Sequence, residues 1–304
     1  MLTIDTAQVG GHAAEKRPSF HLKVTDPLAC EPPARRKFGG RGHIHPRFTS
    51  LVIEGSPLTS GTTTATWGAA RIRSTPNEQC VTFHLTQSSH SSFCPKTRRL
   101  NSGLGPHERS WAMEMAVDPL WVDFEPQGVT VALGDDPEKP DNSYRADWIG
   151  VDWNGVVHAG ENKAHFSHYL DPDYSAKLTA AGLALGAISV EFRRDTGDVR
   201  RRNVRRILNV ANAYGDAFTL VGEHHIAAID DAMAKGGGTT TVGTIENAIG
   251  GATPAARSVV HAALCRRLIS YDLDSRLDGD SVVVVPPTPP FITDIRSINR
   301  IVPL

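Results

Sequence analysis

Two periodicities in the middle of the chain predict a mixed α/β region. Trp111, Ala112 and Met115 share one stripe of a helix, which begins after Pro106 and stops at the Asp-Pro pair that follows. We therefore predict a helix over this segment.

The next residues predict a β-hairpin. Two short runs, one rich in Trp, Ile and Val and the other in Val and Ala, flank Asn154-Gly155, the strongest local signal for a two-residue hairpin turn. Glu161 and Lys163 stand two positions apart on the second strand, so both side chains leave one face, roughly 6–7 Å apart along the strand. Asp147, from the first strand, reaches the same face.

The segment after the hairpin predicts a helix, a strand and a second helix. Residues 174–187 are Ala/Leu-rich with helical spacing, and residues 187–193 form a compact apolar run. Because a helix separates them, we expect this strand to lie parallel to one hairpin strand. The second helix is predicted over residues 198–214, with Asp198 as its N-cap. Its apolar stripe consists of Val204, Ile207, Leu208 and Ala211.

The N-terminal part of the chain differs in composition from the middle. Residues 1–45 carry Pro, Gly, Arg and His with little periodicity, which predicts a flexible arm. Residues 46–100 contain three Thr/Val/Ile-rich runs that predict a small sheet, and the polar, turn-rich stretch 88–105 predicts a hinge. We assign residues 101–214 to a central domain and residues 215–304 to a C-terminal one.

The C-terminal domain has the element order of a winged helix. A helix over 215–235 precedes two helices joined by a Gly-Gly-Ala-Thr turn, with Thr253 as N-cap and Pro254 as first residue of the second. Two strands around Asp278-Gly279 have the form of a wing. A winged helix binds DNA or docks on a protein equally often. The Pro-rich tail is expected to fold back or to bind a partner. Candidate DNA contacts here are Arg257, Arg266, Arg267 and Arg276.

Composition narrows the possible classes of function. The chain has 304 residues, 40% of them hydrophobic, and a net charge of −1, which fits a soluble globular protein and excludes a highly basic coat protein. Its four cysteines lack CxxC spacing, so zinc sites and disulfides are not expected. No apolar stretch has membrane-spanning length and the first residues lack a secretory core, so we expect a cytoplasmic protein without membrane contact.

Basic residues are unevenly distributed along the chain. One cluster lies between Arg35 and Arg41, and a second between Arg193 and Arg206. Such clusters suit contacts with phosphate groups, although the second is also compatible with a solvated helix face. The candidate DNA contacts outside the C-terminal domain are Arg41, His165, Arg201 and Arg205.

The carboxylates of the central domain suggest a chemistry. Asp147 and Glu161 are hard oxygen donors of the kind that Mg²⁺ prefers, and Mg²⁺ completes its shell with waters and phosphate oxygens. Lys163 is placed to stabilise developing charge on a phosphodiester or to orient a water. Glu108, on the first helical turn, is expected to approach the same site. Alternatively, Glu161–Lys163 is a surface ion pair, and Glu108 complements the helix dipole.

These residues resemble a known family. The order of Glu108 on a helix, a buried strand, Asp147, a hairpin and the Glu161-x-Lys163 element resembles the PD-(D/E)XK restriction endonuclease-like core, and within it the TnsA-type transposon endonucleases. The segments that carry the resemblance are RRKFGGRGH, ERSWAMEMAVDPLWVDFEPQ, ADWIGVD and GENK. The chain departs from the family at Ala146, where Pro often precedes the Asp, and in a longer Ser/Thr-rich segment before the helix.

The resemblance implies an α/β restriction endonuclease-like fold, with a mixed central sheet flanked by helices. It implies that Glu108, Asp147 and Glu161 bind Mg²⁺, for which Mn²⁺ substitutes, and that Lys163 is catalytic. The implied activity is a metal-dependent endonuclease that nicks the non-transferred strand at transposon 5′ ends, with a DDE transposase subunit and an ATP-dependent regulator as partners. Two alternatives remain: a restriction, repair or phage nuclease of this fold, and a catalytically idle DNA- or protein-binding adaptor.

Overall fold

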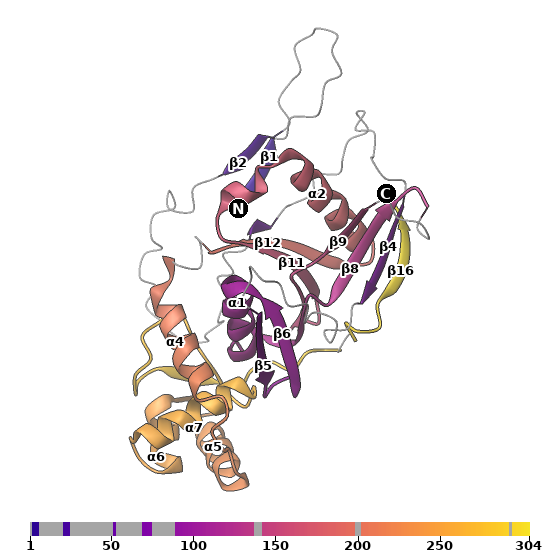
Figure 1. Ribbon diagram of the computed structural model, residues 1–304. Coiled ribbons are helices and arrows are strands. Elements are labelled where there is room, and N and C mark those ends of the chain that lie inside the picture. Colours follow the sequence, from indigo (N-terminus) through magenta and orange to yellow (C-terminus); the bar gives the residue numbers. More distant parts are fainter. Residues whose placement is uncertain are drawn as a thin grey trace.

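The computed structural model describes residues 2–5, 21–24, 51–52, 69–74, 89–136, 142–197, 202–291 and 294–304. Within these ranges the chain is a mixed α/β protein with six α-helices and five sheets (Figure 1). The α/β class predicted from the sequence is confirmed. None of the described helices combines the length and the hydropathy needed to cross a bilayer.

A five-stranded sheet lies at the centre of the molecule, with the strand order β3-β12-β11-β10-β7. Strands β11 and β12 are parallel and the other neighbours are antiparallel, which confirms the predicted crossover. Helix α2 (Pro172–Gly186) makes that crossover, and the side chain of Asp171 caps it by accepting the amide of Tyr174 at 2.8 Å. The strands are β3 (Leu51–Val52), β7 (Trp121–Pro126), β10 (Trp148–Asp152), β11 (Val157–Lys163) and β12 (Val190–Thr196).

Helices α2 and α1 (Gly105–Val117) cover opposite faces of the central sheet, so β11 and β12 pass between them in Figure 1. Leu178 of α2 packs in one buried cluster with Ile149 of β10. Trp111 of α1 stacks on Trp148, with ring centroids 4.5 Å apart, in another. Because Trp148 and Ile149 are neighbours in a strand, their side chains point to opposite faces. Strand β10 is therefore buried on both sides.

The hairpin of β10 and β11 is antiparallel as predicted, but its turn is longer than expected. The amide of Asp152 donates to the carbonyl of Val156 at 3.0 Å, which leaves three residues in the loop instead of two. Gly155 has φ +80°, a left-handed conformation that glycine adopts without strain. The carboxylate of Asp152 also accepts the amide of Asn154 at 2.8 Å, so this side chain organises the turn.

A second sheet, in the order β16-β4-β8-β9, joins distant parts of the chain. Strand β4 comes from the region that was expected to form a sheet of its own, and β16 comes from the Pro-rich tail. The tail thus folds back on the central part of the molecule. The last of the three Thr/Val/Ile-rich runs that were predicted to form a small sheet, residues 80–86, lies outside the described residues. The strands are β4 (Ala69–Ser74), β8 (Val129–Gly134), β9 (Asn142–Arg145) and β16 (Asn299–Pro303).

Two further strand pairs lie in the N-terminal half. Strands β1 (Leu2–Asp5) and β2 (His21–Val24) pair within the segment predicted to be a flexible arm, most of which lies outside the described residues. Strands β5 (Ser89–Cys94) and β6 (Arg99–Leu104) form a hairpin where a hinge was predicted. Lys96, in the turn of that hairpin, donates to the carbonyl oxygens of residues 115 and 118 at 2.7 and 2.6 Å, so the hairpin is fixed to the end of α1. The polar composition of 88–105 therefore indicated a turn, not a hinge.

Helix α4 (Val204–Gly215) begins later than predicted and packs through another face. Its N-cap is Asn203, whose side chain accepts the amide of Arg206 at 3.0 Å, whereas the predicted cap, Asp198, lies outside the described residues. The predicted apolar stripe is exposed. The buried residues are instead Asn209, Val210 and Ala213.

The C-terminal part contains a helix, a strand, two helices and two strands, and its three strands form an antiparallel sheet in the order β13-β15-β14. Thr253 caps the third helix by accepting the amide of Ala256 at 3.1 Å, and Pro254 is its first residue, as predicted. The elements are α5 (Glu223–Lys235), β13 (Thr239–Thr241), α6 (Val242–Ile249), α7 (Pro254–Cys265), β14 (Ser270–Tyr271) and β15 (Val282–Val284).

Candidate active site

The carboxyl end of β11 carries the Glu161-Asn162-Lys163 element, and its side chains alternate between the two faces of the sheet. Glu161 is 3% exposed and forms an ion pair with Lys163, which is half-buried. The prediction that both side chains leave the same face is confirmed. The residue before Glu161 is Gly160. A Cβ atom at this position would collide with the indole of Trp148, so only glycine fits here.

Three tyrosines surround Glu161. Tyr144 of β9 donates its hydroxyl to one carboxylate oxygen at 2.7 Å, and Tyr174 of α2 donates to the other. Tyr169 donates to the backbone oxygens of Glu161 and Asp195, both at 2.8 Å. Burial, and next the negative charge of Glu161, raise the pKa of all three phenols, so they remain hydrogen-bond donors at neutral pH. No local pattern predicts these contacts, because each tyrosine belongs to a different element.

Asp147 lies opposite Glu161 across the hairpin. The ladder ends at the pair Trp148–Gly160, so the next antiparallel pair outward is Asp147–Glu161, on a shared face. The carboxylate of Asp147 accepts the backbone amide of Asn162 at 2.6 Å. This bond fixes the carboxylate of Asp147 against β11.

Glu108 approaches the same region from the first turn of α1. Its carboxylate accepts the side-chain amide of Gln127 at 3.2 Å, and the backbone amide of Gln127 donates to the carbonyl of Asp147 at 2.8 Å. Gln127 has φ 51°, an uncommon conformation for a residue other than glycine. One glutamine thus connects Glu108 with Asp147.

Electrostatic coupling shows that the four predicted residues lie together. Burial, followed by the negative charges of Glu161 and Glu108, raises the pKa of Asp147 well above its ordinary value, while Lys163 acts in the opposite direction. For Lys163, burial acts to lower the pKa, but the carboxylates of Glu161 and Asp147 outweigh it and raise the pKa. Asp147 therefore lies near two other carboxylates and one ammonium group, and the raised pKa favours the protonated form of its carboxyl group.

The donor set suits a hard divalent cation, with a restriction. Among the residues that the structure describes, no group of three or more His, Cys, Asp or Glu side chains is arranged closely enough to hold a metal ion. Both carboxylate oxygens of Glu161 already accept hydrogen bonds. Mg²⁺ commonly uses only one or two protein carboxylates and completes its shell with water. The carboxylates of Asp147 and Glu161 would supply these two ligands, and the carboxylate of Glu108 would lie near them without being a required ligand.

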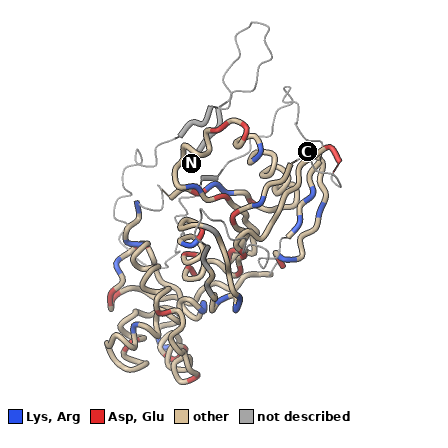
Figure 2. Tube along the Cα trace, in the orientation of Figure 1, with Lys and Arg blue, Asp and Glu red and all other residues tan. Residues whose placement is uncertain are grey.

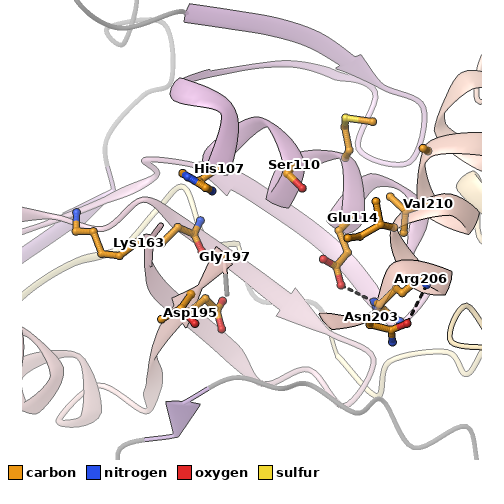
Figure 3. Close-up of a pocket in the computed structure, with 14 residues that line it drawn as sticks. His107, Ser110, Glu114, Lys163, Asp195, Gly197, Asn203, Arg206 and Val210 are labelled. Carbon is orange, nitrogen blue, oxygen red and sulfur yellow. Dashed lines mark hydrogen bonds and ion pairs between the residues drawn. The ribbon is translucent and has the colours of Figure 1, made fainter. Parts of the chain in front are cut away.

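A cavity of about 180 Å³ is bordered by one of the four predicted residues, Lys163, whereas Glu108, Asp147 and Glu161 do not line it (Figure 3). His107, Ser110 and Glu114 border it from α1. Asn162 and Lys163 border it from β11, and the end of β12 and helix α4 complete its wall. The sequence did not predict this cavity, because three elements that are distant in the chain form it.

The predicted DNA contacts have different surroundings. His165 and Arg205 are exposed, whereas Arg41 and Arg201 lie outside the described residues. Arg257 is paired with Glu246. Arg266 donates to the carbonyls of residues 217, 219 and 262, and Arg267 to those of residues 119 and 287, so both guanidinium groups have partners within the protein. Their assignment to DNA remains a prediction.

The predicted basic cluster between Arg193 and Arg206 does not form one surface. Arg194 is buried and donates to Thr179 at 3.2 Å, and Arg193 lies over the ring of Trp121. Arg206 is paired with acidic residues, and Figure 2 shows basic and acidic positions intermixed along the described chain. Of this cluster, Arg202 and Arg205 are exposed within the described residues.

Comparison with known proteins adds no relative. No protein-family model matches the chain, and no curated protein matches it. The functional proposal therefore depends on the geometry of the site and on the resemblance of its motifs.

Proposed function

We propose that this protein is a metal-dependent DNA endonuclease with a PD-(D/E)XK restriction-like core. The observation that carries the proposal is the electrostatic interaction of Asp147 with Glu108 of α1 and with Glu161 and Lys163 of β11, three parts of the chain that are distant in sequence. Two neighbouring carboxylates can bind Mg²⁺, which polarises a phosphodiester, and the ammonium group beside them supplies a further positive charge.

Each residue has a distinct role in this proposal. Asp147 and Glu161 would hold Mg²⁺ or Mn²⁺, and Glu108 would add a nearby carboxylate. The ion, when bound, polarises a phosphodiester and lowers the pKa of a water. Lys163 remains a cation at neutral pH because its neighbouring carboxylates raise its pKa. Its ammonium group stabilises the charge that develops on the phosphate oxygens.

The resemblance to TnsA-type proteins supplies the biological setting. We propose that the substrate is the 5′ end of a transposon, nicked on the non-transferred strand, and that a DDE transposase subunit and an ATP-dependent regulator are the partners. The order α5-β13-α6-α7-β14-β15 supports a winged helix in the C-terminal part. Arg257 at the start of α7 and the exposed Arg276 are candidates for phosphate contacts in this part.

A nicking assay on labelled transposon-end DNA tests the proposal, with Mg²⁺ or Mn²⁺ and with or without the partner transposase. Replacing Asp147 or Lys163 by Ala should lower the rate of nicking by roughly a hundredfold or more, since each supplies charge at the reacting phosphate. Lys235→Ala, at an exposed lysine of α5, is the matched control and should cut like the wild type. Circular dichroism checks that the variants fold. Undiminished cleavage by either active-site variant refutes the assignment.

A second candidate function is a catalytically idle adaptor of the same fold. The observation that favours it is the complete hydrogen bonding of the Glu161 carboxylate by Tyr144 and Tyr174, which is also how a structural carboxylate is satisfied. The two functions differ in their response to Mg²⁺. An adaptor would bind DNA or protein with an affinity that Asp147→Ala leaves unchanged, and its thermal unfolding would not respond to Mg²⁺.

A further inference from the structure

Asn162 carries a buried side-chain amide without a partner among the described residues, and it borders the cavity that Lys163 also lines. The residue is 9% exposed, and neither Oδ1 nor Nδ2 has a hydrogen-bond partner among the described residues. Leaving a buried polar group unpaired costs about 1–3 kcal/mol, so folded proteins rarely retain one without a reason. The amide borders a cavity of about 180 Å³. Both polar atoms lie below the accessible surface, so a ligand in this cavity would satisfy them once the side chain turns towards it.

The charges around the cavity disfavour an anionic ligand. Arg206 is already paired with Glu114, Asp118 and Asp274, and Lys163 is paired with Glu161. The carboxylates of Glu114 and Asp195 also border the space and would repel a phosphate inside it. The ligand that fits is therefore neutral and polar, with any phosphate group outside the cavity.

The walls and the size of the cavity restrict the ligand further. Its apolar lining comes from Met113 of α1 and from Ile207, Val210 and Ala211 of α4. At about 180 Å³ the space is smaller than the roughly 300–1,000 Å³ of pockets for drug-sized ligands. An apolar wall facing an amide suits one planar ring system that carries hydrogen-bonding groups on its edge.

We propose that this cavity receives a single base of the DNA, unstacked from the duplex beside the phosphate that is cut. The inference rests on the proposed nuclease function. An amide offers one acceptor and two donors side by side, which can pair with the edge of a base, while the apolar wall lies against its ring. The backbone amide of Asn162 donates to Asp147 at 2.6 Å, so the residue that would hold the base also fixes a carboxylate of the active site.

Fluorescence of 2-aminopurine tests this proposal with the full-length protein. Duplexes carry the probe at successive positions around the nick mapped with wild-type protein, and Ca²⁺ replaces Mg²⁺ to hold the uncut complex. We expect a several-fold rise in fluorescence at one position, because the base loses its stacking. Asn162→Leu keeps the shape and removes the amide, so the rise should vanish and DNA affinity should fall roughly five- to a hundredfold.

Two controls separate a ligand-binding role from a structural one. Asn212→Leu, at an exposed asparagine of α4, should leave fluorescence and affinity unchanged. Asn162→Leu should unfold at the same or a higher temperature than the wild type, because it removes an unpartnered buried amide. A variant that loses DNA binding while it keeps its thermal stability supports a ligand role for Asn162.

The remaining outcomes overturn the proposal in distinguishable ways. Wild-type protein that binds and nicks DNA without a rise at any probe position rules out the base site and leaves the nuclease function intact. Unchanged fluorescence with Asn162→Leu does the same. If this variant loses only its response to the partner transposase, the cavity receives a protein side chain instead. Wild-type protein that neither binds nor nicks DNA overturns the nuclease function together with the base site.

Discussion

Two clusters in this protein contain the same charges in different arrangements. Around Arg206, one cation contacts three carboxylates directly, those of Glu114, Asp118 and Asp274. Around Lys163, the ion pair is with Glu161, and burial, followed by the negative charges of Glu161 and Glu108, raises the pKa of Asp147.

The difference between the two clusters indicates their roles. The planar guanidinium of Arg206 has donors in several directions and can satisfy three partners at once, which a lysine ammonium on a flexible stem does less well. Burial acts to lower the pKa of Arg206, but the three carboxylates outweigh it and raise the pKa. Each carboxylate of the Arg206 cluster thus contacts the guanidinium directly, and the cluster joins α1, α4 and the segment after β14. The Lys163 cluster is incomplete by comparison, because its ammonium is paired with Glu161, and a divalent cation would add positive charge beside Asp147.

Removal of Arg206 should have the largest effect on stability. Arg206→Met leaves three carboxylates without their cation, two of them in the joint between α1 and the C-terminal part, and should lower the free energy of unfolding by roughly 3–5 kcal/mol. Urea denaturation followed by circular dichroism measures the change. Arg205→Met, at the exposed neighbouring position, is the control and should change stability by less than about 0.5 kcal/mol. Equal effects of the two substitutions would contradict the structural role of the Arg206 cluster.

The sequence predicted the Lys163 cluster but not the Arg206 cluster, for a physical reason. Glu161 and Lys163 are two residues apart on one strand, so the period of a strand places them together. Arg206 meets Glu114 and Asp274 across separations of 92 and 68 residues, which no local period encodes. The same holds for the tyrosines around Glu161 and for the cavity at Asn162.

For helix α4 the helical spacing of apolar residues predicted the helix correctly but predicted the wrong face to be buried. The stripe that contains Ile207 and Leu208 has helical spacing, yet Leu208 is 50% exposed. The helix instead packs through Val210 and Asn209, whose amide donates to the carbonyls of residues 273 and 275 at 2.8 and 2.7 Å. A polar residue becomes buried when distant carbonyls satisfy it, and the sequence does not reveal those carbonyls.

Substitution of Asp147 tests whether the Lys163 cluster is incomplete. Because its folded-state pKa is raised, Asp147 contributes stability that is fully present below its unfolded pKa and is lost as pH rises through the folded value. In EDTA at pH 8, Asp147→Asn should therefore be more stable than the wild type by about 1–2 kcal/mol, and the gain should disappear below about pH 4. Added Mg²⁺ should stabilise the wild type and not the variant, as thermal unfolding would show.

Asp152 provides a control of opposite sign for this experiment. Burial acts to raise its pKa, but the hydrogen bond from His158 at 3.1 Å outweighs it and holds the pKa below its usual value. Asp152→Asn should therefore destabilise the protein at neutral pH and approach wild-type stability as pH falls through the lowered pKa. If the two Asp→Asn substitutions change the free energy of unfolding with the same dependence on pH, the pKa of Asp147 is not raised by its neighbouring carboxylates.

The smallest effects are expected from a matched pair of glutamates, one in each cluster. Glu114→Gln weakens a direct ion pair with Arg206 and should destabilise the protein by about 1 kcal/mol. Glu108→Gln keeps the partner of Gln127 but removes a charge that raises the pKa of Asp147, so stability in EDTA should stay within about 0.5 kcal/mol of the wild type or rise slightly. The Mg²⁺-induced rise in melting temperature should shrink only in Glu108→Gln, because a cation at Asp147 would lose a neighbouring carboxylate. A rise that shrinks in Glu114→Gln instead would move the cation site from β11 to the Arg206 cluster.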